Sequence, residues 1–163
     1  MGATKNMIRG TIYTSVYVVT TIIIPFLLFN WVRNLQIPLV GEITLTQENY
    51  ENIIFWILAF GLIISGCAFF SYSSPKQSIR RAVFALIQVI VNCLYLWSYK
   101  FSGATEILFN FTISGYTGFL SLSLQTMVLV YMGVYFLTII LKIYDLIDFS
   151  INRKKIRENR MKA

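Results

Sequence analysis

Residues Ile107 to Leu141 read ILFNFTISGYTGFLSLSLQTMVLVYMGVYFLTIIL, the longest part of the chain without a charged side chain. Roughly 18 uncharged, mostly apolar residues suffice to suggest a transmembrane helix, and this run has about 35. A straight helix of that length would extend about 50 Å, whereas the hydrocarbon core of a bilayer is about 30 Å thick. The run therefore predicts a membrane protein in which only part of the run forms a simple span.

The composition of the whole chain agrees with a membrane protein. Of its 163 residues, 56% are hydrophobic and 13% are charged, whereas soluble domains contain roughly 25% charged residues. We predict one domain, an all-α polytopic membrane protein with a four-transmembrane-helix bundle and a basic cytoplasmic tail. The expected spans are residues 10–32, 52–74, 79–99 and 119–144, and the expected tail is residues 145–163.

Basic residues alternate between the loops in the manner of the positive-inside rule. They cluster before the first span, between the second and third spans and after the fourth span, while the other two loops contain one each. This pattern predicts that both termini are cytoplasmic and that the protein lies in the cytoplasmic (plasma) membrane. Because the net charge of +7 is divided among these clusters, rather than spread along one face, nucleic-acid binding is not expected.

Enzymatic chemistry has little support in the sequence. There is no histidine, and the two cysteines are Cys67 and Cys93. A histidine-based metal site or a histidine general base is therefore excluded. Paired carboxylates, a nucleophile beside a base and a phosphate-binding glycine loop are also missing. We expect no catalysis, no cofactor and no metal.

Polar and small residues recur at helical spacing in the second, third and fourth spans. Amides in hydrocarbon need hydrogen-bond partners and small residues let helix backbones approach closely, so these positions should face other helices rather than lipid. Three uses remain open: packing within one chain, an interface on a symmetric oligomer axis, or the lining of a pore or ligand cavity. The candidate residues are Gly61, Ser65, Gln88, Asn92, Tyr131, Tyr135 and Thr138.

Residues 101–118 interrupt the apolar sequence before the fourth span. They are expected to form either a loop on the outer membrane surface or a short re-entrant or interfacial segment. Within them, TISGYTG resembles the TVGYG selectivity filter of potassium channels, whose backbone carbonyls replace the hydration shell of the ion. This resemblance covers seven residues, Thr112–Gly118, and their order differs from that of the filter. The candidate residues of this segment are Asn110, Thr112, Ser114, Gly115, Tyr116 and Gly118.

A set of basic residues at the inner end of the fourth span and in the tail suits anionic lipid headgroups. Lys142 lies near the inner boundary of that span, where it can reach the headgroups or pair with Asp145. Docking of a cytoplasmic protein is the alternative use of the same residues. The set comprises Lys142, Arg153, Lys154, Lys155, Arg157 and Arg160.

The leading functional expectation is a small, homo-oligomeric integral membrane protein that acts as a channel-like or membrane sensor component without catalysis. A chain of four short helices has little interior, so a deep polar stripe is most useful at a symmetric interface. The alternative is an accessory subunit or membrane anchor of a larger membrane complex, which docks a cytoplasmic partner through its basic tail.

Overall fold

Four long apolar helices dominate the computed structural model, and each is long and apolar enough to cross a membrane. They agree with the prediction of a multi-pass membrane protein. The shortest has 23 residues, which corresponds to about 35 Å of helix against a hydrocarbon core of about 30 Å. The spans are Thr4–Arg33, Gln47–Ser73, Ile79–Phe101 and Gln125–Ile151. The structure describes residues 2–34, 36–37, 41–42, 47–75, 78–102, 104–113 and 116–152.

The first span contains a π-helical turn directly before Pro25. Proline has no N–H, and its ring would collide with the carbonyl four residues earlier in a regular α-helix. In the π-helical turn, the Ile24 N–H donates to the Val19 carbonyl, five residues back. This wider turn accommodates the proline within one continuous helical span. The three parts of the span are α1 (Gly2–Val18), η1 (Val19–Ile23) and α2 (Ile24–Arg33).

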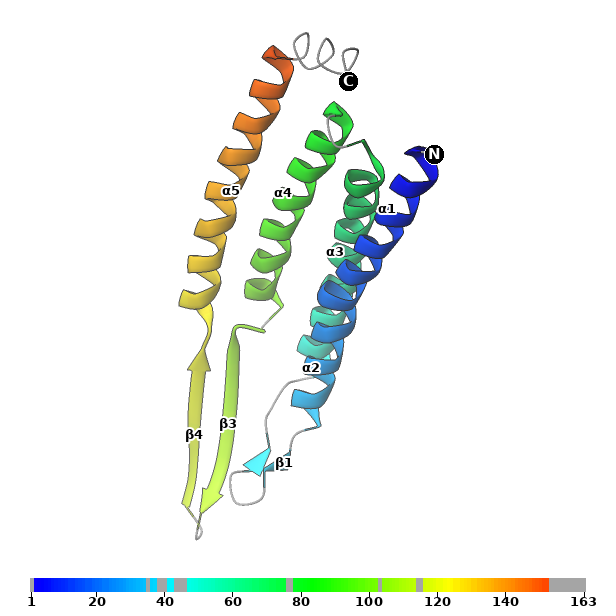
Figure 1. Cartoon of the computed structure of the whole chain (residues 1–163). Helices are drawn as coiled ribbons and strands as arrows, with labels where there is room; N and C mark the ends of the chain where they lie inside the picture. Colours follow the sequence, from blue (N-terminus) through cyan, green and yellow to red (C-terminus); the bar gives the residue numbers. More distant parts are fainter. Residues whose placement is uncertain are drawn as a thin grey trace.

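The second and third spans, α3 (Gln47–Ser73) and α4 (Ile79–Phe101), form a helical hairpin. Pro75 follows α3 closely and favours its termination. Ser78 caps α4, because its hydroxyl accepts a hydrogen bond from the Arg81 N–H at 3.3 Å. The connection is short, so the two helices run antiparallel beside each other (Figure 1).

The spans form an open row rather than a closed bundle. α3 packs against both α1 and α4, and α5 (Gln125–Ile151) packs against α4. The first span and α5 therefore lie at the two ends of the row (Figure 1). The core follows this order, because Ile53, Ile57 and Ile64 of the central α3 are fully buried, whereas α5 has no buried residue.

A β-hairpin connects α4 to α5. Its strands, β3 (Glu106–Ile113) and β4 (Tyr116–Ser123), each contain eight residues and pair in antiparallel orientation. The hairpin projects beyond the ends of α4 and α5 and does not fold back among the helices (Figure 1). A smaller hairpin, β1 (Gln36–Ile37) with β2 (Gly41–Glu42), lies between α2 and α3, and β2 contacts β3.

The larger hairpin contains most of residues 101–118, for which the sequence predicted a surface loop or a short re-entrant or interfacial segment. Asn110 pairs with Phe119 and Thr112 pairs with Thr117, so these two candidates belong to an antiparallel strand ladder. The remaining candidates include two that the structure describes and two that it does not. Tyr116 and Gly118 belong to β4, and Ser114 and Gly115 lie outside the described residues.

The same hairpin explains why the fourth helix begins at Gln125 rather than at residue 119. Residues 119–123 belong to β4 instead. The corresponding sequence signal is the alternation of apolar and polar residues in FNFTI (109–113) and LSLS (120–123), on either side of a Ser-Gly pair. Such alternation is typical of strands, and Ser-Gly is typical of turns.

Both hairpins lie at one end of the helix row. The start of α1, the connection between α3 and α4 and the last turn of α5 lie at the other end (Figure 1). We call these the hairpin end and the terminal end. An even number of spans places the first and last helix ends on one side.

Candidate functional site

The polar stripe of α4 faces other helices of the same chain over much of its length. Gln88 is 6% exposed and Tyr95 is 8% exposed, while Asn92 is half-buried. These positions agree with the principle that amides and hydroxyls within a span avoid lipid. Packing inside the chain therefore uses part of the stripe.

The Tyr95 hydroxyl connects α4 to the interrupted first span. It donates to the Thr21 carbonyl at 3.0 Å and accepts a hydrogen bond from the Tyr99 hydroxyl at 2.6 Å. In a regular α-helix the Thr21 carbonyl would accept from residue 25, but Pro25 has no N–H. Tyr95 thus supplies a hydrogen-bond donor to a carbonyl whose α-helical partner position is occupied by a proline.

Glycine allows the first span to approach α3 closely. A Cβ atom at Gly61 would overlap the Ile22 side chain and would lie 3.4 Å from the Thr21 carbonyl oxygen. At the terminal end, a Cβ atom on Gly10 would lie only 2.9 Å from the Cβ atom of Ser73. The two glycines therefore set the separation between the first span and α3.

Ser65 lies one turn from Gly61 on the buried face of α3 and is 3% exposed. Its hydroxyl has no hydrogen-bond partner among the residues that the structure describes. Ser65 therefore contributes a small side chain to this packing face rather than a polar link to α4.

Arg9 links α1 to α3 by hydrogen bonds at the terminal end of the row. Its Nε and Nη2 atoms donate to the Tyr72 carbonyl at 3.0 and 2.8 Å, and Nη2 also donates to the Ser74 carbonyl at 3.1 Å. The last carbonyls of a helix have no partner within that helix, and a cation is favourable there. On sequence alone, Arg9 contributes only to the topology, because nothing local indicates that it caps α3.

Two amides of the stripe are not paired within the described part of the chain. No side-chain hydrogen bond there involves the Gln88 or the Asn92 amide. Asn92 lies about 20 Å along α4 from Ile79 and about 14 Å from Phe101, which places it near the middle of a bilayer. An amide at this depth is costly without a partner.

Tyr131 and Tyr135 of α5 line a pocket of about 400 Å³. Tyr99 of α4 and Phe29 of α2 line the same pocket, and the rings of these two residues lie 6.0 Å apart. The pocket is mainly aromatic and aliphatic, and it lies at the hairpin end of the row. The structure therefore brings Tyr131 and Tyr135 together with Tyr99.

The remaining candidates of the stripe lie outside this pocket. Gln88 and Asn92 are not among its lining residues. The Thr138 hydroxyl donates to the Val134 carbonyl within α5 at 2.8 Å, so its polar group is satisfied without another helix. In this pocket, the α5 candidates Tyr131 and Tyr135 therefore meet Tyr99 of α4 rather than Gln88 or Asn92.

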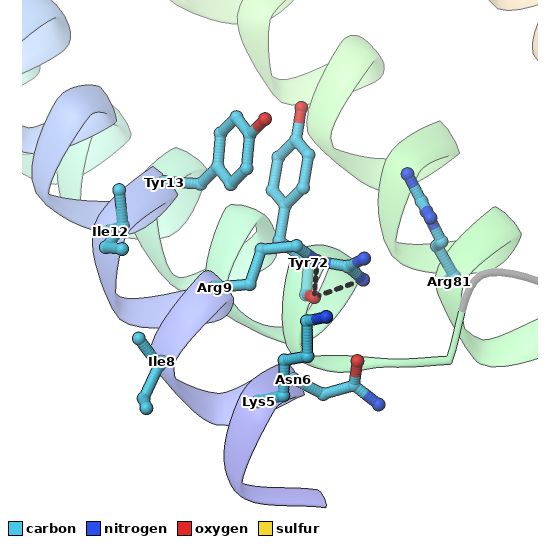
Figure 2. A pocket seen from close by; sticks show the side chains of 8 residues that line it. All are labelled: Lys5, Asn6, Ile8, Arg9, Ile12, Tyr13, Tyr72 and Arg81. Carbon is cyan, nitrogen blue, oxygen red and sulfur yellow. Dashed lines mark hydrogen bonds between the residues drawn. The ribbon is translucent and has the colours of Figure 1, made fainter. Parts of the chain in front are cut away.

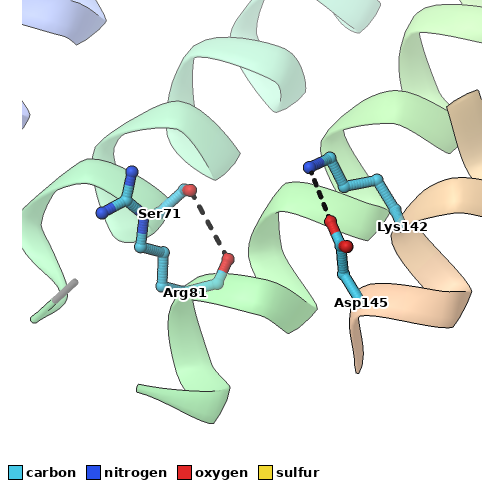
Figure 3. Close-up of polar contacts among 4 residues, drawn as sticks. All are labelled: Ser71, Arg81, Lys142 and Asp145. Atoms are coloured by element: carbon cyan, nitrogen blue, oxygen red, sulfur yellow. Dashed lines mark hydrogen bonds and ion pairs between the residues drawn. The ribbon is translucent and has the colours of Figure 1, made fainter. Parts of the chain in front are cut away.

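Polar contacts at the terminal end include an ion pair within α5. Lys142 Nζ lies 3.1 Å from Asp145 Oδ2, and Figure 3 shows the two side chains pointing toward each other. Both side chains are exposed, so the pair contributes at most about 1 kcal/mol. Figure 3 also shows the Ser71 hydroxyl, which donates to the Arg81 carbonyl at 3.5 Å and links α3 to α4.

The basic residues of the tail that were predicted to contact lipid or a partner lie outside the described residues. They are Arg153, Lys154, Lys155, Arg157 and Arg160. Lys142 is the member of that set whose surroundings the structure describes.

Within the described ranges, no group of three or more cysteine, aspartate and glutamate residues could hold a metal ion. Comparisons of the chain with protein-family models, with curated proteins and with solved structures find no match. The functional proposals therefore depend on the geometry of this chain.

Proposed function

We propose that the protein is a small, non-catalytic integral membrane protein that works as a homo-oligomer, as a channel-like or sensor component. The observation that carries this proposal is the Asn92 amide, which is half-buried near mid-bilayer and has no hydrogen-bond partner within the described chain. Polar side chains of this kind form hydrogen bonds between membrane helices. A second copy of the chain supplies the same amide as a partner.

The open arrangement of the helices supports an interface between copies. A row of four helices does not enclose a lumen, so a conducting path would have to lie between copies around a symmetry axis. The residues of the α4 stripe differ in exposure. Gln88 and Tyr95 are buried inside the chain, whereas Asn92 is partly accessible. Asn92 is therefore the member of the stripe closest to the proposed interface.

Asn92→Leu is expected to weaken the oligomer while the fold is preserved. Each interhelical hydrogen bond of this type contributes about 1–2 kcal/mol in peptide systems, so the association constant should fall about 5- to 30-fold per lost contact. The measurement is the mass distribution in mild detergent across a range of protein concentrations. Asn30→Leu, in the first span near the hairpin end, is the matched control and should leave the distribution unchanged. A wild-type chain that is monomeric throughout would exclude the proposal.

Reconstitution separates the channel-like role from the sensor role. Liposomes containing the wild-type oligomer are expected to conduct ions if the axis forms a pore, and Asn92→Leu should reduce this flux. Oligomers that conduct no ions would rule out the pore and leave the sensor role.

We also propose that the terminal end of the row faces the cytoplasm of the cell, with the protein in the cytoplasmic membrane. Phe119→Cys on β4 and Ile151→Cys at the end of α5 form a matched pair of probes, because both native residues are 75% exposed. A membrane-impermeant thiol reagent added to intact cells should label residue 119 and not residue 151. Labelling of residue 151 alone would reverse the orientation.

The second candidate function is an accessory subunit or anchor that docks a cytoplasmic protein. It is favoured by the length of α5, whose 27 residues reach about 40 Å and exceed the hydrocarbon core by about two turns. The basic residues from Arg153 onward directly follow this helix. Co-purification of a stoichiometric cytoplasmic partner that is lost when the tail is neutralised would favour this role over the channel-like one.

A further inference from the structure

A basic pocket lies at the terminal end of the row, where α1, α3 and α4 meet. It has a volume of about 710 Å³. Three of its lining side chains are cations, and none is acidic. Figure 2 shows Lys5 and Arg9 reaching from α1 toward the end of α3, with Arg81 across from them on α4. The lining residues are Lys5, Asn6, Ile8, Arg9, Ile12, Tyr13, Tyr72 and Arg81.

The positive charge of this pocket is not neutralised within the described part of the chain. Neither Lys5 nor Arg81 forms an ion pair with another described residue. Arg81 Cζ lies 5.9 Å from the centre of the Tyr72 ring. Like charges that line one pocket repel one another unless a counter-charge is present, so an anion would stabilise this arrangement.

Arg9 is held in place before any ligand binds. Its Nε and Nη2 atoms are engaged by the Tyr72 and Ser74 carbonyls, and Tyr13 stacks on Tyr72 with ring centres 4.0 Å apart. Among the residues that the structure describes, its Nη1 group has no acceptor. A planar guanidinium held in this way suits the oxygens of a phosphate group.

The pocket also has an apolar rim. Ile8 is 57% exposed and Ile12 is 58% exposed, and both follow the cationic first turns of α1 into the span. The α1 segment from Lys5 to Ile12 extends about 10 Å along the helix axis. The cationic side chains and the apolar side chains of this segment therefore lie next to each other, within the thickness of the lipid headgroup region. A ligand that joins a phosphate to hydrocarbon fits both parts.

We propose that this pocket binds the phosphate group of an anionic membrane phospholipid, with Lys5, Arg9 and Arg81 around the phosphate and the acyl chains along Ile8 and Ile12. Basic pockets between transmembrane helices bind lipid headgroups in this way. The start of α4 at Ile79 adds the positive end of a helix dipole beside Arg81. This site is independent of the oligomeric role proposed above.

The test compares two neighbouring arginines of α4. The full chain is purified in mild detergent and titrated with phosphatidylglycerol or phosphatidylcholine, and bound lipid is counted by native mass spectrometry. Arg81→Gln should weaken phosphatidylglycerol binding about fivefold and leave phosphatidylcholine binding unchanged. Arg80→Gln removes the same charge but should have no effect, because Arg80 lies over the Phe70 and Phe84 rings and does not line the pocket.

Equal losses in Arg80→Gln and Arg81→Gln would show that binding follows overall charge, and they would overturn the proposal. If Arg81→Gln lowers the yield of folded protein, Lys5→Gln provides the same comparison, because Lys5 is exposed and its loss should not disturb packing. Lys100→Gln, at the hairpin end, is the matched control for that substitution.

Competition identifies the source of the phosphate. Phosphatidylglycerol that stays bound in excess inorganic phosphate supports a lipid ligand, because free phosphate lacks the acyl chains that contact Ile8 and Ile12. Complete displacement by inorganic phosphate would assign the pocket to a free anion and overturn the lipid assignment.

Discussion

Gly61→Leu is expected to push the first span away from α3 and to destabilise the folded chain by about 1–3 kcal/mol, the usual cost of overpacking. Even a Cβ atom at this position overlaps the Ile22 side chain. The displacement would also separate the Thr21 carbonyl from Tyr95, because Thr21 adjoins Ile22 in η1. The effect should therefore include loss of that hydrogen bond.

The matched control for Gly61→Leu is Gly66→Leu on the same helix. No atom lies within 4 Å of a Cβ placed on Gly66, so this substitution should face open space and have little effect. The measurement is the temperature at which Cys67 and Cys93 react with a thiol-reactive fluorophore, since Cys67 is buried in the folded chain. Equal midpoints for the two variants would show that Gly61 does not set the helix separation.

Tyr95→Phe is expected to cost up to about 1.7 kcal/mol, the upper range for hydrogen bonds between membrane helices. The hydroxyl that donates to the Thr21 carbonyl at 3.0 Å is lost. The same substitution should cost less in a Pro25→Ala background, because residue 25 then has an N–H that can pair with this carbonyl. Tyr95 and Pro25 should therefore be coupled although they lie in different helices.

A double-mutant cycle measures this coupling. The unfolding midpoints of the wild type, the two single variants and the double variant are compared by the same thiol assay. Tyr99 loses its acceptor in both backgrounds, so that contribution cancels. Tyr131→Phe is the matched control, because Tyr131 is 51% exposed on α5. Equal costs of Tyr95→Phe in both backgrounds would contradict the proposed role of the hydroxyl.

The candidate site was only partly predictable from residue spacing. The stripe of α4 is visible in the sequence because a period of three or four residues identifies one helix face. Spacing does not say which helix that face meets, and here Tyr95 reaches the first span rather than only the adjacent α3. The role of Arg9 as a cap of α3 could not be predicted from the sequence either. Its acceptors, the Tyr72 and Ser74 carbonyls, lie more than 60 residues away in the chain.

The hairpin at β3 and β4 was missed for a different reason. Its residues are uncharged except Glu106 and lie directly before an apolar helix, so a count of charged residues joins them to the span. The alternation in residues 109–113 is a weaker signal than the length of the uncharged run. A search of the sequence for apolar residues at every second position, made before charged residues are counted, would separate the strands from the helix.

By itself, the sequence determined the number of spans and their helical character. In hydrocarbon a spanning segment must pair its own backbone groups, so an uncharged run of about 20 residues has few alternatives to a helix. Only the tertiary structure decided the open order of the helices, the hydrogen bond from Tyr95 to the Thr21 carbonyl, and the placement of Lys5, Arg9 and Arg81 around one pocket. These features depend on contacts between segments distant in the chain, for which no local pattern of residues encodes a partner. The stretch from Ile107 to Leu141 illustrates the two kinds of information. Its length without a charge predicts a membrane protein from the sequence, whereas the pairing of β3 with β4 in the tertiary structure divides it between a β-hairpin and a helix.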